Sequence, residues 1–290
     1  MGQYHPESPA RLDAIHDMLL ASGLDAVLRH YDAPLATREQ LLRVHSADYL
    51  DILFNHSPQH GIVSIDGETC MNPHTIKAAL RAAGAGVCAV DLIHAGDINS
   101  AFCSVRPPGH HAERARAMGF CFFNNIAVAV AHAMAILELE RVAIVDFDVH
   151  HGNGTEDIFL QDERVLICST FQHPLYPYSG TETQSPHIVN VPLPAVTTGP
   201  IFRVAVTRYI LPALHSHRPQ MLFISAGFDG HVQDELANMC LTEGDYAWIT
   251  SEIRQIADQY ASGRIVSMLE GGYALSALGR SVVVHLKALL

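Results

Sequence analysis

Apolar positions beyond residue 95 fall into short runs that are separated by longer segments with helical spacing. The runs typical of buried strands cover residues 101–105, 142–147, 165–170, 188–191, 221–226 and 265–269. The helical segments cover residues 124–137, 201–214, 243–260 and 274–290. Strands that alternate with helices of about ten residues or more predict a mostly parallel sheet with helices on both faces.

The first third of the chain is predicted to be mainly helical. Apolar spacing predicts helices over residues 9–20 and 38–54, and a third, Ala-rich helix over residues 72–94. A brief apolar run at residues 62–66 predicts a short strand. Since no repeat, low-complexity tract or linker interrupts the sequence, we expect residues 1–290 to form a single α/β domain, built as a three-layer sandwich.

The composition is that of a globular protein with a large core, because 49% of the residues are hydrophobic and only 17% are charged. The chain has 18 basic and 30 acidic residues, a formal net charge of −12. This balance argues against a nucleic-acid-binding protein and mildly favours cationic small molecules or cationic protein segments as partners. A solvated acidic surface accounts for most of the charge in the simpler interpretation.

The cysteine pattern favours an intracellular protein. Six cysteines are widely spaced without a CxxC pair, so we expect reduced core residues, with neither a disulfide framework nor a structural zinc site. No apolar stretch reaches about 18 residues, and the N-terminus lacks a basic-then-apolar leader. The sequence therefore predicts a soluble, cytoplasmic protein without a membrane segment.

Four of the predicted strands end in polar side chains suited to catalysis. The strand-end residues are His110 and His111 after 101–105, Asp148 and His150 after 142–147, Asp229 after 221–226, and Tyr273 after 265–269. Because parallel strands present their carboxyl ends to the same edge of a sheet, these residues are expected to meet in one pocket.

Asp148 and His150 are two residues apart, so in an extended segment both side chains point the same way and can hold one cation. Asp229 would be the third ligand. Three protein ligands and a water form the open arrangement of a catalytic metal, and zinc, Fe(II), Co(II) or Mn(II) would accept these donors. The alternative, a helix-capping Asp148 beside a core histidine, becomes weaker once Asp229 is included.

His110 and His111 are adjacent, so they diverge and can do separate work. One could be the general base that deprotonates the attacking water, and the other a charged or hydrogen-bonding neighbour. Tyr273 follows two glycines, and its phenol could donate to a substrate oxyanion. Each of these motifs alone is also typical of an ordinary turn. Their positions directly after predicted strands are what favours a catalytic role.

Five segments in this order, RPPGHH, GFCFFNN, DFDVHHGNGTEDIF, SAGFDGH and LEGGY, resemble the zinc-dependent histone deacetylase family. The resemblance is to its class II-like branch and to the bacterial deacetylases and acetylpolyamine amidohydrolases. It covers nearly the whole chain from HPESPARL onward. It implies the arginase–deacetylase fold, an α/β sandwich, which agrees with the predicted alternation.

The resemblance also implies roles for the catalytic residues. His111 would be the general base and acid, with Asn153 as its hydrogen-bond partner. His110 would be an electrostatic partner backed by Asp146, a carboxylate that in the family also helps to bind a structural potassium ion. Tyr273 would polarise the scissile carbonyl.

Three further groups of residues are implied in the same way. The resemblance implies one zinc ion per chain, held by Asp148, His150 and Asp229. It implies an acyl-lysine tunnel formed by Gly119, Phe120 and Tyr176, with Leu236 at its rim. It implies that Arg11 lines an inner channel for acetate release.

The sequence departs from the family pattern at two places, the segment before His5 and position 235. Family members usually carry a first sheet strand before the turn at His5, and we expect that strand to be absent or shortened here. Glu235 precedes Leu236 where relatives usually have proline, which could reshape the rim or favour a cationic substrate.

The leading hypothesis is a metal-dependent amidohydrolase that removes acetyl or acyl groups from lysine-type amines or polyamines. An acetylpolyamine-specific enzyme is one alternative. A ureohydrolase with two manganese ions is another. It would need a bridging carboxylate two residues after His150, where this chain has Gly152, and His231, two residues after Asp229, is the remaining candidate ligand for a second ion. A silent acyl-lysine-binding protein is a third. The partner is expected to be an acetylated amine, and a homo-oligomer stays open.

Overall fold

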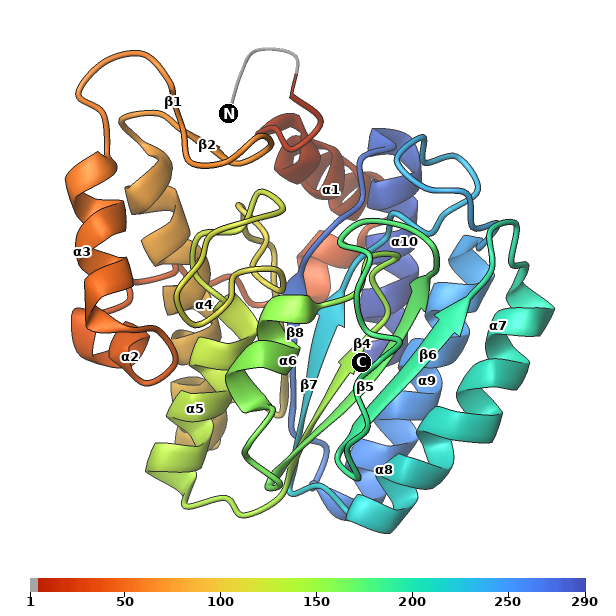
Figure 1. Cartoon of the computed structure of the whole chain (residues 1–290). Coiled ribbons are helices and arrows are strands. Elements are labelled where there is room, and N and C mark those ends of the chain that lie inside the picture. The colour runs from red at the N-terminus through yellow and green to blue at the C-terminus, as the bar shows by residue number, and fades with distance from the viewer. Residues whose placement is uncertain (1–4) are drawn as a thin grey trace.

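Six strands form one sheet in which every neighbouring pair runs parallel (Figure 1). The computed structural model describes residues 5–290. The strands are β3 (Ser100–Cys103), β4 (Val142–Asp146), β5 (Val165–Gln172), β6 (Ile188–Leu193), β7 (Met221–Ala226) and β8 (Ile265–Leu269). Their order across the sheet is β3-β8-β7-β4-β5-β6, so the four strands predicted to carry catalytic residues are neighbours.

Helices cover both faces of the sheet, which confirms the predicted sandwich (Figure 1). One face carries α2 (Arg38–Leu42), α3 (Ala47–His56), α4 (Thr75–Ala95) and α5 (Asn125–Leu137). The other carries α1 (Ala10–Ala21), α7 (Gly199–Ala205), α8 (Leu211–His217), α9 (Glu243–Tyr260) and α10 (Leu275–Leu289). The short helix α6 (Asn153–Phe159) contacts α5, and a 3-10 turn (Leu24–Val27) follows α1.

The strands are apolar on both sides because both sides are covered. Along β4, Val142 and Ile144 belong to the core beneath α4 and α5, whereas Ala143 and Val145 belong to the core beneath α9 and α10. All four side chains are fully buried. Continuous apolar strands of this kind are typical of parallel sheets between two helical layers.

The predicted helix over 38–54 is wrong as a single element, because the chain forms α2 and α3 with a break between them. Ser46 caps α3, where its hydroxyl accepts a hydrogen bond from the Tyr49 amide at 3.3 Å. His45 is buried in the break, and its ring nitrogens bond to the Glu113 carbonyl and the Asn124 amide. These long-range contacts outweigh the local helical pattern.

The predicted helix over 201–214 is longer than expected and irregular. It comprises α7, a π-helical turn at Val206–Ile210, and α8. Pro212 lies in the first turn of α8 and has no amide to donate, which accounts for the change in hydrogen-bond spacing before it.

A hairpin of two short strands, β1 (Val63–Ser64) and β2 (Cys70–Met71), replaces the single strand predicted at 62–66. Asp66 forms the turn by accepting hydrogen bonds from the Glu68 and Thr69 amides. The expectation about a first strand before His5 concerns residues outside the described range.

Among residues 5–290, no helix combines the length and hydropathy that a membrane crossing requires. All six cysteines are free, as predicted. Only Cys103, Cys121 and Cys168 are buried, so the prediction of core cysteines is wrong for the half-buried Cys70, Cys88 and Cys240.

Candidate active site

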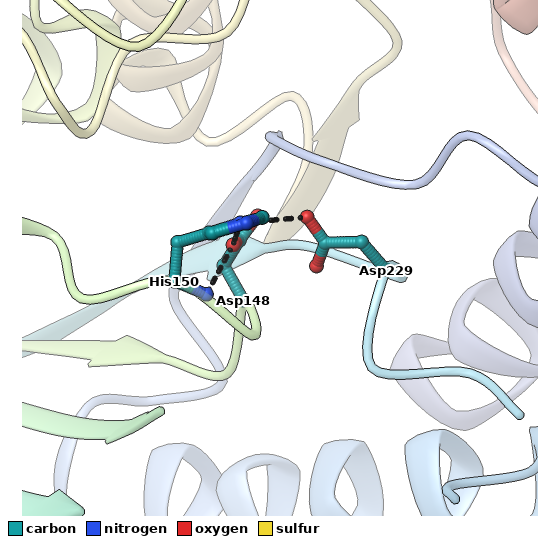
Figure 2. A group of neighbouring side chains, drawn as sticks. All are labelled: Asp148, His150 and Asp229. Atoms are coloured by element: carbon teal, nitrogen blue, oxygen red, sulfur yellow. Dashed lines mark hydrogen bonds and ion pairs between the residues drawn. The ribbon is translucent and has the colours of Figure 1, made fainter. Parts of the chain in front are cut away.

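Two neighbouring strands, β4 and β7, bring Asp148, His150 and Asp229 together at their carboxyl ends (Figure 2). His150 Nδ1 lies 3.1 Å from Asp148 Oδ1 and 3.1 Å from Asp229 Oδ2. One ligand atom from each residue lies within 4.8 Å of the others. The predicted group of three possible metal ligands is therefore assembled.

The prediction that Asp148 and His150 point the same way because they lie in an extended segment is wrong. The strand ends at Asp146 and the next residues form a bend, not an extended segment. The Asp148 carboxylate makes this bend itself, because its Oδ1 accepts a hydrogen bond from the His150 amide at 2.8 Å. A local side-chain turn, and not strand alternation, directs the two ligands toward Asp229.

Backbone amides orient both carboxylates. Asp148 Oδ2 accepts from the Gly271 amide at 2.8 Å, and Asp229 Oδ1 accepts from the Val149 amide at 3.0 Å. A Cβ atom at Gly271 would lie 1.9 Å from Asp229 Oδ2, so glycine is required where the segment after β8 passes the ligands. Gly227 is similar, since its Cβ would lie 2.0 Å from Asp148 Oδ2.

The electrostatics of the group favour a cation between the carboxylates. Burial raises the pKa of Asp229 to about 6, and the charge of Asp148 adds to this effect. For His150, burial opposes the charged form, but the hydrogen bonds to Asp148 and Asp229 raise the pKa to about 10. An imidazolium balances the two carboxylates in this state, and a divalent cation would do so with His150 neutral.

The tandem histidines have different partners. His110 Nδ1 lies 3.0 Å from Asp146 Oδ2, and His111 Nδ1 lies 2.8 Å from Asn153 Oδ1. Burial opposes charge on His110, yet the carboxylates of Asp148 and Asp146 raise its pKa well above the usual value. Burial lowers the pKa of His111 well below its usual value, and the charges of His110 and His150 add to this effect. The site thus favours the charged form of His110 and the neutral form of His111.

Glu270 is a buried residue of the site that the sequence interpretation missed. It follows β8, and its Oε2 accepts from the amides of Gly109 and His110 at 2.7 and 3.1 Å. Burial raises its pKa to about 7. The signal was present in LEGGY, where an acidic residue directly follows a mostly apolar strand.

Arg11 packs against Tyr273, one of the predicted site residues. The Arg11 guanidinium stands 5.0 Å from the centre of the Tyr273 ring and donates to the carbonyls of Gly272 and Glu270. The Tyr273 amide donates to Asp234 Oδ2 at 2.6 Å. The backbone that leads to Tyr273 is therefore held by Arg11, and the tyrosine amide itself by Asp234. The channel role of Arg11 stays a prediction.

A cavity of about 420 Å³ opens above these residues, and we call it the tunnel. Its wall consists of His5, Pro6, Gly67, Glu68, Cys70, Pro108, His110, His111, Gly119, Phe120, His150, Tyr176, Leu236, Gly271 and Tyr273. This wall includes Gly119, Phe120, Tyr176 and Leu236, the four residues predicted to form the tunnel or its rim. Gly119 has φ +55°, and a Cβ there would lie 2.4 Å from the His111 ring. The sequence did not indicate that the β1–β2 hairpin supplies Gly67, Glu68 and Cys70 to this wall.

A wider, acidic cavity of about 740 Å³ adjoins the tunnel, and we call it the outer groove. The two share Gly67, Glu68 and Tyr176. The acidic residues of the outer groove are Asp66, Glu68, Glu113, Glu156 and Asp157. This concentration of charge fits the expected preference for cationic partners.

A second metal group is not present among residues 5–290, where Asp148, His150 and Asp229 are the one cluster of three or more possible ligands. His231 instead faces Glu243 at 3.4 Å. This arrangement does not favour the two-manganese alternative.

Comparisons with known proteins give one consistent result. A sequence model described as the histone deacetylase domain matches residues 5–289. The histone deacetylase-like amidohydrolase of Pseudomonas aeruginosa is 39% identical over 277 residues, 93% of this chain and 73% of that protein. A probable deacetylase of Archaeoglobus fulgidus is 36% identical over 282 residues, 93% of this chain and 77% of that protein. The crystal structure of the HDA15 HD domain matches with a TM-score of 0.94 and 34% identity, covering 100% of this chain and 83% of that one.

Proposed function

The chain belongs to the histone deacetylase family, and from that membership we propose that it hydrolyses acetyl amides of lysine-type amines or polyamines with one zinc ion. One observation carries the proposal. The ligand group of Asp148, His150 and Asp229 lies at a tunnel whose wall also holds His111 and Tyr273. A proton acceptor and a phenol donor therefore flank the place where a metal would be held.

Asp148, His150 and Asp229 fit a zinc ion. Two oxygens and one nitrogen are donors that zinc accepts, and Gly227 and Gly271 leave the space that their carboxylates need. A bound zinc ion would polarise the attacking water and the carbonyl oxygen of the substrate. The potassium ion expected at Asp146 has no comparable support, because the described contacts of its carboxylate are the His110 ring and the Asp148 amide.

The side chains of the protein divide the remaining chemistry. His111 accepts the proton of the attacking water and returns it to the leaving amine. His110, charged beside Asp146, offsets the negative charge that develops during attack. Tyr273 donates its phenol proton in a hydrogen bond to the substrate oxygen as that oxygen gains charge.

The tunnel favours a narrow apolar stem that ends in an amide. Phe120 and Tyr176 give it aromatic walls, and the rings of His111 and Tyr176 meet edge to face at 5.2 Å. The acidic outer groove would accept a cationic continuation of the substrate. Both a basic peptide and a polyamine meet this description, and the exposed Glu235 beside Leu236 adds to the case for a cation.

One experiment tests the proposal and separates its alternatives. Protein loaded with zinc, Fe(II), Co(II) or Mn(II) is assayed on acetyl-lysine peptides, acetylputrescine and acetylspermidine, before and after chelation. We expect one metal ion per chain and activity that is lost with chelation and restored with metal. Broad activity on peptides would refute a polyamine-specific enzyme. Full activity of metal-stripped protein would overturn the proposal, and binding without turnover would support a silent acyl-lysine-binding protein.

A further inference from the structure

We propose that Glu113 is a positioning residue that sets the tautomer of His111 through the side-chain amide of Asn153. The inference rests on the proposed function, in which His111 accepts a proton. Asn153 lies between the two residues, with its Oδ1 2.8 Å from His111 Nδ1 and its Nδ2 2.8 Å from Glu113 Oε1. Glu113 itself lines the outer groove, on the side of Asn153 away from the tunnel.

The direction of each hydrogen bond in this chain follows from chemistry. A carboxylate only accepts, so the Asn153 amide must turn its NH₂ group toward Glu113. Its carbonyl oxygen then faces His111 and also only accepts, so His111 Nδ1 must carry the hydrogen. The lone pair of the neutral ring is left on Nε2. A carboxylate two side chains away thus determines which nitrogen of His111 is the base.

Glu113 is the strongest acceptor available to the Asn153 amide. The other two contacts of Nδ2 are the His111 carbonyl oxygen at 3.5 Å and the Met118 sulfur at 3.2 Å, both weak. Without the carboxylate, little would prevent the amide from rotating by half a turn. Its NH₂ group would then face His111 Nδ1 and stabilise the wrong tautomer.

The backbone of Glu113 is fixed independently of its side chain. Its amide donates to the Arg116 carbonyl at 2.9 Å, and its carbonyl lies 3.0 Å from His45 Nδ1. His45 Nε2 accepts from the Asn124 amide at 2.9 Å, so His45 Nδ1 must be the donor to Glu113. These bonds place the carboxylate against Asn153, so removing the charge changes the acceptor without releasing the loop.

Exchanging the two side-chain types provides the test. In Glu113→Gln, the new amide can present either its oxygen or its NH₂ group, so we expect kcat to fall about 10- to 100-fold, as for other residues that orient a catalytic group. In Asn153→Asp, two carboxylates face each other and repel, which also lowers kcat. In the double variant, the introduced glutamine amide donates to the introduced aspartate, whose carboxylate again accepts from His111. We expect the double variant to recover kcat to within about 3-fold of the wild type.

A matched control separates this effect from the charge of the outer groove. Asp157→Asn removes an exposed negative charge from the same cavity wall. The Asp157 carboxylate accepts a hydrogen bond from the Arg114 amide at 2.9 Å, and the side-chain oxygen of the introduced asparagine can still accept it. We expect this control to change KM for a cationic substrate as Glu113→Gln does, without the fall in kcat. Losses that multiply in the double variant, or an unchanged kcat in Glu113→Gln, would overturn the proposal.

A spectroscopic measurement keeps the inference testable if the proposed reaction is absent. In zinc-loaded protein with ¹⁵N-labelled histidine, the His111 signals are assigned by their loss in His111→Phe. We expect the Nδ1–H tautomer in the wild type and in the double variant, and a mixture in Glu113→Gln. The same tautomer in all three proteins would refute the positioning role, whether or not the enzyme deacetylates the substrates tested.

Discussion

The floor of the site, formed by Asp148, His150 and Asp229, and the entrance of the tunnel, formed by Glu68, Cys70 and Leu236, are built differently. On the floor, Asp148 and Asp229 are almost fully buried, and each has a carboxylate oxygen bonded to a backbone amide just after another strand of the sheet. At the entrance, Glu68 and Cys70 come from a hairpin with two-residue strands, and Leu236 lies 39% exposed on a loop. The proposed metal ligands are thus held at the strand ends of the sheet, whereas the proposed substrate-contacting groups are held by loops.

This difference separates chemistry from specificity. A displacement of about 1 Å at a reacting group can cost about 100-fold in rate, so the floor requires a rigid frame. Loops tolerate change and commonly carry recognition. If the comparison holds, equivalent substitutions will have large effects on the floor and small effects at the entrance.

The largest difference is expected between two glycine substitutions. In Gly271→Ala, the new Cβ would lie 1.9 Å from Asp229 Oδ2 and 2.7 Å from Asp148 Oδ2, so both ligands must move. We expect zinc content and deacetylase activity to fall below about 1% of the wild type. In Gly67→Ala at the entrance, the Cβ meets no atom within 4 Å, and we expect activity within about 3-fold. Metal analysis and circular dichroism would distinguish loss of zinc from loss of folding, and a fully active Gly271→Ala protein would contradict the ordered floor.

The next effect concerns the phenol of Tyr273. Tyr273→Phe removes the proposed donor to the developing oxyanion and keeps the ring that contacts Arg11 and Phe120. We expect kcat to fall about 100- to 1000-fold with KM and zinc content nearly unchanged. Steady-state kinetics on an acetyl-lysine peptide would measure this, and unchanged turnover would remove the tyrosine from the proposed mechanism.

Sequence patterns predicted the floor better than the entrance for physical reasons. Parallel strands must bury both faces, so their apolar runs are visible, and polar residues such as Asp148 and Asp229 stand out at their ends. The buried Glu270 was missed because it depends on hydrogen bonds to the distant amides of Gly109 and His110. The bend at Asp148 was missed because its carboxylate bonds to an amide two residues on, and the hydrophobic pattern carries no sign of such a side-chain turn. The β1–β2 hairpin was predicted only in part, as a single strand at 62–66, because two-residue strands have no period to read.

The scaffold beneath the floor is expected to be acid-sensitive through His285. This residue is fully buried on α10 and bonds to Ser267 of β8, the strand that leads to Glu270. Burial lowers its pKa to about 3 from the unfolded value of 6.5, so the folded protein binds fewer protons. Its contribution is complete above pH 6.5 and is lost as the pH falls toward 3, by about 1.4 kcal/mol per pH unit.

Urea unfolding at pH 6.5 and pH 5 would measure this contribution. The free energy of unfolding should fall less in His285→Gln than in the wild type, by about 2 kcal/mol over this range. A residual fall is expected in the variant, because burial also lowers the pKa of His45, to about 4. Equal falls in the two proteins would show that His285 does not couple folding to pH.

The smallest effect is expected at the rim of the tunnel. Leu236 is partly exposed, so we expect Leu236→Ala to remove only part of the proposed contact with the substrate stem, worth about 1 kcal/mol or less. We expect KM to rise up to about 5-fold, with kcat and zinc content within about 2-fold of the wild type. Val232→Ala is the matched control, because Val232 lies on the same loop, is 54% exposed and does not line the tunnel. A large fall in kcat for Leu236→Ala would break the separation of floor from entrance, since it would mean that the rim positions the reacting groups as well as the substrate.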